Sequence, residues 1–206
     1  EIDAEFFLAS TSEVYGDPEI HPQIESYKGS VNCTGPRSCY CEGKRFAESL
    51  TFDFARTYDL KVHVARIFNT YGPGMLVNDG RVISSFICQS LKDQYIRIYG
   101  SGQNTRSFCY IDDLISGLIK LMNSNFLGPI NIGNNEEISI LSLAKMISRK
   151  INHKVDIEFC SPREDDPKFR KPELLLAKNN INWQPKINLD TGISLTINYF
   201  RKILDL

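Results

Sequence analysis

Residues 6–16 read Phe-Phe-Leu-Ala-Ser-Thr-Ser-Glu-Val-Tyr-Gly, an apolar run that passes directly into hydroxyl and carboxylate side chains. A short apolar run of this kind predicts a buried strand, and the polar side chains then stand at its carboxyl end. Open α/β sheets bind their ligands at that end of the strands. We therefore expect residues 10–16 to line a ligand crevice.

The segments that follow alternate between helix-like and strand-like patterns. Apolar side chains recur at four-residue spacing at Phe46, Leu50 and Phe54, which predicts a helix over residues 38–58. Residues 62–68 form the next predicted strand and end in a turn-forming cluster rich in Gly and Pro. This alternation predicts an α/β fold with parallel strands.

Beyond residue 75 the predicted elements become shorter and less regular, as expected of a small second lobe. Asp112 and Ser139 are the expected N-caps of two of its helices. Predicted helices cover residues 83–91, 112–122, 139–151 and 190–204, and predicted strands cover residues 96–99 and 129–132.

Composition limits the kinds of partner. The 206 residues carry 24 basic and 25 acidic side chains, a net charge of −1, which gives no field to attract nucleic acid or an anionic membrane. No apolar run approaches the roughly 20 residues that cross a bilayer, and the start resembles no signal peptide, so we expect a cytoplasmic protein. The six cysteines lack paired metal-ligand spacing, so we expect reduced thiols and no metal site.

Tyr40 and Lys44 stand four positions apart in the predicted helix, which puts the phenol and the ammonium on one face. An ammonium near a phenol favours the phenolate and lowers a pKa that is about 10 when unperturbed, so the tyrosine can act as a base. Taken alone, the spacing favours a surface helix whose tyrosine packs while its lysine is solvated. The base is favoured because residues 10–16 and 66–73 end two strands at the same sheet edge.

Four motifs resemble the extended short-chain dehydrogenase/reductases that modify nucleotide sugars. They are STSEVYG at 10–16, Tyr-x-x-x-Lys at 40–44, RIFNTYGP at 66–73 and YGSGQNTRSFCYIDD at 99–113. Within that family the similarity is greatest to the UDP-glucuronate decarboxylases, and residues 165–172 and Trp183 strengthen it. The resemblance implies that residues 1–75 form the C-terminal part of a Rossmann-like doubly wound parallel sheet. Residues 76–206 would be mainly a small α/β nucleotide-sugar lobe, with segments returning to the sheet.

The resemblance implies a catalytic triad of Thr11, Tyr40 and Lys44 with NAD as cofactor. Tyr40 would deprotonate the sugar 4-hydroxyl while hydride passes from C4 to NAD, and Lys44 would hold the cofactor ribose. Thr11 would hydrogen-bond to the 4-oxygen, or simply cap the strand end. The 4-ketone lies β to the C6 carboxylate, so CO2 can leave without a metal, and returned hydride gives UDP-xylose. Glu13 and Arg170 would surround the carboxylate and C5.

Other positions are carried over from the same resemblance. Ser12 separates the decarboxylases from the 4,6-dehydratases, which have an Asp there to help expel water, because a serine hydroxyl is a poor general acid. The expected substrate contacts are Ser12 and Arg170 at the sugar, Asn69 and Arg106 at the diphosphate, and Ile98 and Tyr99 beside the uracil. Thr70 and Arg81 are expected to approach the cofactor or nucleotide.

Several alternatives stay open. The dinucleotide fingerprint Gly-x-x-Gly-x-x-Gly is absent, so we expect a piece of a longer protein that binds NAD poorly alone. The chain could belong to a 4,6-dehydratase or a 4-epimerase, or be a non-catalytic fragment that keeps a homodimer surface on the helix with Tyr40. Arg66 is expected to be a structural ion-pair partner, and His21, His63 and His153 to be non-catalytic.

Overall fold

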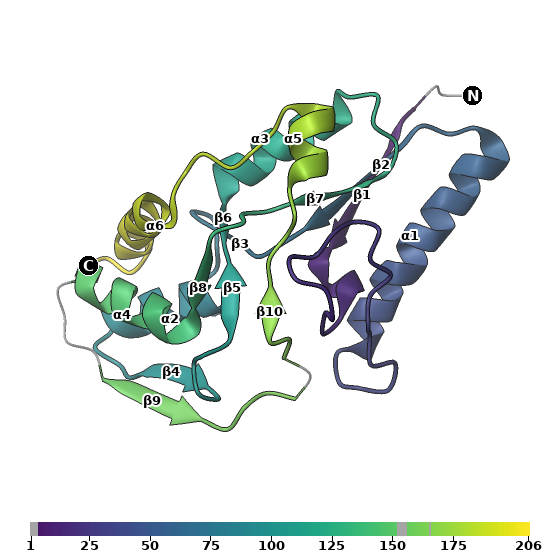
Figure 1. Ribbon diagram of the computed structural model, residues 1–206. Coiled ribbons are helices and arrows are strands. Elements are labelled where there is room, and N and C mark those ends of the chain that lie inside the picture. The colour runs from purple at the N-terminus through teal and green to yellow at the C-terminus, as the bar shows by residue number, and fades with distance from the viewer. Residues whose placement is uncertain (1–3, 152–155, 165) are drawn as a thin grey trace.

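The computed structural model describes residues 4–151, 156–164 and 166–206. Its central parallel sheet has the order β1 (Phe6–Thr11), β2 (Val62–Ile67) and β7 (Pro129–Ile132). In Figure 1, α1 (Ser38–Tyr58) lies on one side of this sheet, and α3 (Ile111–Met122) and α5 (Leu175–Ile181) lie on the other. Helices on both faces of a parallel sheet confirm the predicted α/β class.

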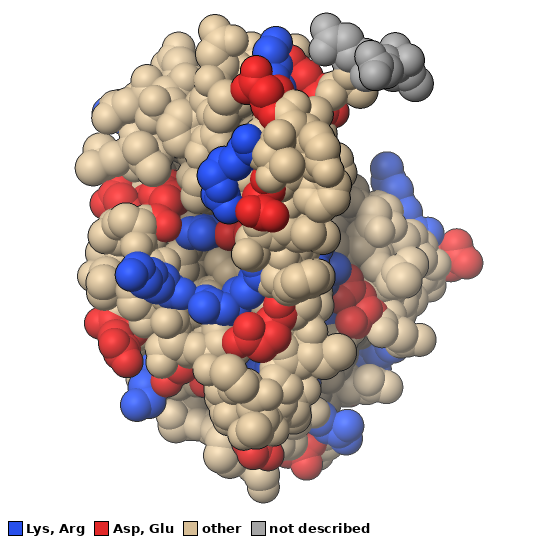
Figure 2. Space-filling view, turned by 90° about the vertical axis from the view of Figure 1, so that its right-hand side faces the viewer, with Lys and Arg blue, Asp and Glu red and all other residues tan. Residues whose placement is uncertain are grey.

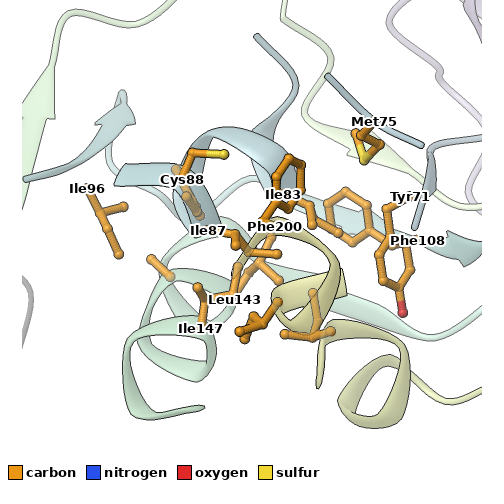
Figure 3. Close-up of a cluster of buried hydrophobic side chains, with 14 of the residues drawn as sticks. Tyr71, Met75, Ile83, Ile87, Cys88, Ile96, Phe108, Leu143, Ile147 and Phe200 are labelled. Atoms are coloured by element: carbon orange, nitrogen blue, oxygen red, sulfur yellow. The ribbon is translucent and has the colours of Figure 1, made fainter. Parts of the chain in front are cut away.

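The remaining elements form a second body of short pieces. Helices α2 (Val82–Leu91), α4 (Ile140–Ile151) and α6 (Leu189–Ile203) pack around a core that includes Ile83, Ile87, Leu143, Ile147 and Phe200 (Figure 3). The parallel pair β4 (Ile96–Tyr99) and β9 (Ile157–Cys160) borders this core.

Three very short strands connect the two bodies: β10 (Phe169–Arg170), β5 (Thr105–Ser107) and β8 (Glu137–Ser139) form one small sheet in that order. A further pair joins β3 (Thr70–Tyr71) to β6 (Cys109–Tyr110). These strands, together with the 3-10 turn η1 (Ser12–Tyr15), hold the predicted site residues at the carboxyl end of the central sheet.

Most predicted elements are confirmed, and one predicted helix cap is wrong. Helix α3 is capped by Tyr110, so Asp112 lies in its first turn and does not cap it. Ser139 does act as expected, since its hydroxyl accepts a hydrogen bond from the amide of Ser142 at 3.1 Å. The last helix begins at Leu189, because Asn188 accepts from the amide of Thr191 at 2.9 Å.

The apolar stripe of α1 predicts the helix correctly but does not mark a buried face. Phe46, Leu50 and Phe54 are 67%, 44% and 48% exposed, and the residues that the structure describes leave them uncovered. No described helix is both long and apolar enough to cross a membrane.

Candidate active site

A cleft of about 860 Å³ opens at the carboxyl ends of β1 and β2, facing the second body. Its wall contains nearly all of the residues predicted for the site: Thr11, Ser12, Glu13, Tyr40, Asn69, Thr70, Arg81, Ile98, Tyr99, Arg106 and Arg170. Lys44 is the exception. Figure 2 shows basic and acidic side chains side by side around a hollow in one face of the molecule.

The end of β1 turns sharply into the cleft. The Thr11 hydroxyl accepts a hydrogen bond from the amide of Glu13 at 3.2 Å and so caps η1. The hydroxyl oxygen serves as the acceptor that caps the turn, which leaves the hydroxyl proton available to donate. Thr11, Ser12 and Glu13 are all buried yet line the cleft, so the turn places two hydroxyls and a carboxylate on one wall.

Tyr40 and Lys44 both stand near this turn, in the first half of α1. Tyr40 is 52% exposed on the cleft wall. The Lys44 ammonium donates a hydrogen bond to the carbonyl of Ala9 at 2.9 Å. The ammonium is therefore anchored to the backbone of β1, two residues before Thr11.

Glu13 lies between two arginines. Its Oε1 accepts a hydrogen bond from Arg37 Nη2 at 2.6 Å and forms an ion pair with Arg170 Nη2 at 2.8 Å. The Cys41 thiol donates to its Oε2 at 3.8 Å. Burial alone would raise the pKa of Glu13, but the charge of Arg170 and the hydrogen bond from Arg37 outweigh burial and hold the pKa below its usual value. Glu13 is thus kept as a carboxylate.

Arg37 is the cleft residue that the sequence reasoning missed. It lies at the start of α1, three positions before Tyr40, and lines the cleft. Its position at the start of the helix that carries the Tyr-x-x-x-Lys motif is a sequence signal that could have indicated a cleft residue. Its partner Glu13 lies 24 positions away, and only the fold brings the two together.

The next layer of the wall is built on β5 and β10. Arg170 Nη1 donates to Asn69 Oδ1 at 3.2 Å. Arg106 is buried, donates to the carbonyls of Thr105 and Lys168 at 2.8 and 3.2 Å, and pairs with Asp166 at 3.0 Å. Burial, followed by the charge of Arg170, lowers the pKa of Arg106.

The outer part of the cleft is more open. Tyr99 is 46% exposed, and the guanidinium of Arg163 lies 4.1 Å from its ring centroid, a cation–π contact. Ile98 is fully buried and packs into the core of the second body. Arg81 is largely exposed and pairs with Asp79 at 3.1 Å.

Thr70 also belongs to the cleft wall, on the side of β3. Its hydroxyl donates to the carbonyl of Phe68 at 3.0 Å, which fixes the hydroxyl and leaves its oxygen lone pairs as acceptors.

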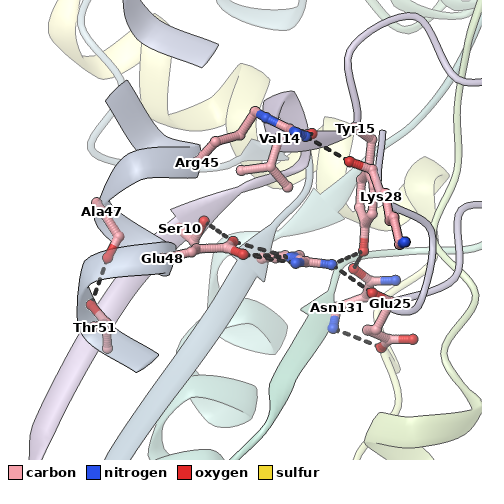
Figure 4. Close-up of polar contacts among 11 residues, drawn as sticks. Ser10, Val14, Tyr15, Glu25, Lys28, Arg45, Ala47, Glu48, Thr51 and Asn131 are labelled. Carbon is pink, nitrogen blue, oxygen red and sulfur yellow. Dashed lines mark hydrogen bonds and ion pairs between the residues drawn. The ribbon is translucent and has the colours of Figure 1, made fainter. Parts of the chain in front are cut away.

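Arg66 is a structural ion-pair partner, as predicted. It pairs with Glu48 at 2.7 Å and donates to the hydroxyl of Tyr15 at 3.0 Å, while Ser10 donates to the same Glu48. Figure 4 shows Ser10 and Glu48 facing Tyr15 and Asn131 across this network. The network joins α1 to the strands beneath it.

The other titratable groups lie elsewhere. His21 pairs with Glu137 at 3.1 Å and His63 contacts the carbonyl of Phe126 at 3.1 Å, and neither lines the cleft; His153 lies outside the described residues. All six cysteines are free, as predicted. Within residues 4–151, 156–164 and 166–206, no cluster of His, Cys, Asp and Glu is placed to hold a metal ion.

This chain is similar in sequence to UDP-glucuronic acid decarboxylases. UDP-glucuronic acid decarboxylase 1 of Xenopus tropicalis is 50% identical over 204 residues, 99% of this chain and 48% of that protein. UDP-glucuronic acid decarboxylase 3 of Arabidopsis thaliana is 49% identical over 200 residues, 97% of this chain and 58% of that protein. The chain spans about half the length of these relatives.

Solved structures share the fold. A UDP-glucose 4-epimerase of Thermotoga maritima with UDP-glucose matches with a TM-score of 0.91 and 28% identity, over 97% of this chain and 64% of that one. A UDP-glucuronic acid 4-epimerase of Bacillus cereus, in complex with UDP-glucuronic acid and NAD, matches with a TM-score of 0.85 and 26% identity. The match covers 97% of this chain and 62% of that one.

A protein-family model described as GDP-mannose 4,6 dehydratase matches residues 1–196. That match takes in the β1 turn, the Tyr40 helix and the Glu13–Arg170 pair, together with both bodies of the fold. The chain belongs to this family, which is one of extended short-chain dehydrogenase/reductases.

Proposed function

We propose that the protein carrying this chain decarboxylates UDP-glucuronate to UDP-xylose. The observation that carries the proposal is the pairing of Glu13 with Arg170 on the cleft wall that also holds Tyr40 and Thr11. Tyr40 can then act as a base on a sugar hydroxyl, and the Glu13–Arg170 pair can contact the carboxylate of the same bound sugar. The sequence identity of 49–50% to UDP-glucuronic acid decarboxylases supports this choice within the family.

Tyr40 is the proposed base for the sugar 4-hydroxyl. It lies on the cleft wall, and its exposure leaves the phenol free to meet a ligand. Thr11, whose hydroxyl accepts from the amide of Glu13, keeps its own proton to donate toward the 4-oxygen. Lys44, anchored on the carbonyl of Ala9, is the proposed contact for the cofactor ribose.

NAD is the proposed cofactor. Hydroxyl groups at Thr11, Tyr40 and Thr70 and the ammonium of Lys44 are hydrogen-bonding groups of the kind that fit a ribose, and Arg81 adds a cation at the outer wall. When bound, NAD would accept a hydride from sugar C4 and return it later. Bacillus cereus UDP-glucuronic acid 4-epimerase is a relative in fold that binds NAD.

Glu13 and Arg170 would then act at the other end of the sugar. Arg170 orients the C6 carboxylate, and the lowered pKa of Glu13 keeps that group charged, so it holds Arg170 in place. Ser12 offers a hydroxyl where a dehydratase needs an acid, which fits a reaction whose leaving group is neutral CO2. The family description as a dehydratase therefore does not fix the reaction.

The nucleotide end of the substrate would lie toward the second body. Arg106, together with Asn69, is the proposed diphosphate contact, because a guanidinium matches phosphate oxygens. Tyr99, with Ile98 behind it, is the proposed neighbour of the uracil.

The assembly is a homodimer in this proposal. Phe46, Leu50 and Phe54 form an exposed apolar stripe on α1, which a second copy of the chain would cover. The division at residue 75 into sheet and sugar lobe is part of the same proposal, with β7 as a segment that returns to the sheet. The cytoplasmic location expected from the sequence stays a prediction.

The test is a product assay. A dinucleotide-binding segment with the Gly-x-x-Gly-x-x-Gly fingerprint is joined ahead of residue 1, and the protein is given UDP-glucuronate with a catalytic amount of NAD. Equal amounts of CO2 and UDP-xylose are expected. A UDP-hexuronate epimer without CO2 would assign the protein to the epimerases, and recovery of untouched substrate would favour the non-catalytic fragment.

A further inference from the structure

The guanidinium of Arg37 has no part in the chemistry proposed above, yet it occupies the cleft wall at the start of α1. Its Nη2 donates to a carboxylate oxygen of Glu13 at 2.6 Å, and the Nη2 of Arg170 forms an ion pair with the same oxygen at 2.8 Å. One carboxylate is therefore shared by two cations, one from α1 and one from β10.

This sharing leaves a surplus charge. Two guanidinium groups on one carboxylate carry a net charge of +1. The Glu13 and Arg170 side chains are 9% and 11% exposed, whereas that of Arg37 is 42% exposed, so Arg37 presents the surplus to the cleft. An unbalanced charge at a partly buried site is unfavourable, and one anionic group on a ligand would balance it.

Among the residues that the structure describes, the neighbouring charges leave this surplus in place. Arg106 is next to the cluster but pairs with Asp166 at 3.0 Å, so that pair is balanced. The Cys41 thiol, the third partner of Glu13, has a pKa raised by burial and by the charge of Glu13, and is therefore neutral near pH 7. One negative charge, that of a single ligand carboxylate, would therefore balance the net charge of +1 at Glu13.

We propose that Arg37 determines specificity by selecting nucleotide sugars that carry a carboxylate on the sugar. This inference rests on the proposed function, because it assumes that the sugar lies beside Glu13 and Arg170. Substrate with its carboxylate balances the charge that Arg37 presents. The pentose product has lost that carboxylate as CO2, so it is held less tightly and leaves more readily.

Calorimetric titration of the chain with UDP-glucuronate and with UDP-glucose tests the proposal. In Arg37→Gln, the affinity for UDP-glucuronate should fall about tenfold, the size of one charge-assisted hydrogen bond, while UDP-glucose stays within about twofold. Arg37→Lys should restore part of the preference, because it returns the charge. The preference of the unaltered chain should shrink with added salt, since Arg37 is partly exposed.

Arg56→Gln is the matched control. This substitution removes the same charge from the same helix. Arg56 lies at the far end of α1, and its side chain is 69% exposed. Its ratio of affinities should equal that of the unaltered chain.

The outcomes separate two failures. Equal weakening of both ligands in Arg37→Gln, or an unchanged ratio, would overturn the specificity role and leave the proposed function intact. Equal affinity of the unaltered chain for both sugars would also overturn it. Binding of neither UDP sugar would sink the proposed substrate class, and the role of Arg37 with it.

Discussion

Tyr40 stands half-exposed on the cleft wall, one helical turn before Lys44, and its phenol is the proposed base. Tyr40→Phe removes the acid–base group and almost no volume. Turnover should fall at least about a hundredfold while the affinity for UDP is kept, measured by initial rates and by titration. Tyr58→Phe, at the exposed end of the same helix, should keep full turnover. Wild-type rates in Tyr40→Phe would remove the tyrosine from the mechanism.

Glu13 makes stability depend on pH. The pKa of its carboxyl is below the usual value in the folded chain: burial opposes this shift, but Arg170 and Arg37 outweigh it. The unfolded chain therefore binds more protons at acid pH, so Glu13 stabilises the fold above its unfolded pKa of about 4.3, and this contribution is lost as the pH falls through the native pKa. Glu13→Gln should flatten the acid-side loss of stability in urea titrations stepped from neutral to acid pH. A slope as steep as that of the unaltered chain would count against the ion pairs.

Sequence reasoning found the residues of the cleft that stand in motifs and missed Arg37, whose partner Glu13 lies in a distant segment. Thr11, Ser12 and Glu13 follow a strand directly, so their place at the sheet edge follows from the pattern. Arg37 meets Glu13 only because residues 17–37 fold back toward β1. No local periodicity encodes such a return.

At the scale of elements, long patterns were predictable and short ones were not. The bounds of α1 and β7 match the prediction, because each has a clear period or flanking breakers. Strands β3, β6 and β10 are two residues long, too short for an alternating pattern to appear. These short strands carry Thr70 and Arg170 into the cleft, so their positions came from the resemblance alone.

The buried pair of Arg66 and Glu48 fastens α1 to β2 and so fixes the helix that carries Tyr40. Their side chains are 12% and 9% exposed, so Arg66→Met would leave a buried carboxylate unpaired and cost about 3 kcal/mol of unfolding free energy. Arg56→Met breaks a pair with Asp53 on the same helix whose side chains are 69% and 68% exposed, and should cost less than about 0.5 kcal/mol. Equal losses in chemical denaturation would show that the buried network does not fasten the helix.

At the scale of the whole molecule, the α1 stripe is the clearest unexplained surface. Substituting both Phe46 and Phe54 by Ser should shift the chain from dimer to monomer in sedimentation equilibrium, because it removes the apolar area that a second copy would bury. Leu175→Ser, an equally exposed apolar position on α5, should leave the dimer unchanged. A monomer before any substitution would contradict the proposed assembly.

The division at residue 75 stays a prediction, drawn from the drop in pattern length after that residue. The return of β7 to the central sheet was expected only in general terms. Its pairing with β2, with Arg66 opposite Asn131, depends on contacts between distant segments that no local pattern specifies.

The most direct test of the proposed reaction follows the carboxyl carbon. UDP-glucuronate labelled at C6 is given, with catalytic NAD, to the protein joined to its dinucleotide-binding segment, and labelled CO2 is collected. The label should leave as CO2 in step with UDP-xylose and should stay on the sugar in Tyr40→Phe. Label retained on a product of the unaltered protein, or released at the same rate without the Tyr40 hydroxyl, would contradict the mechanism.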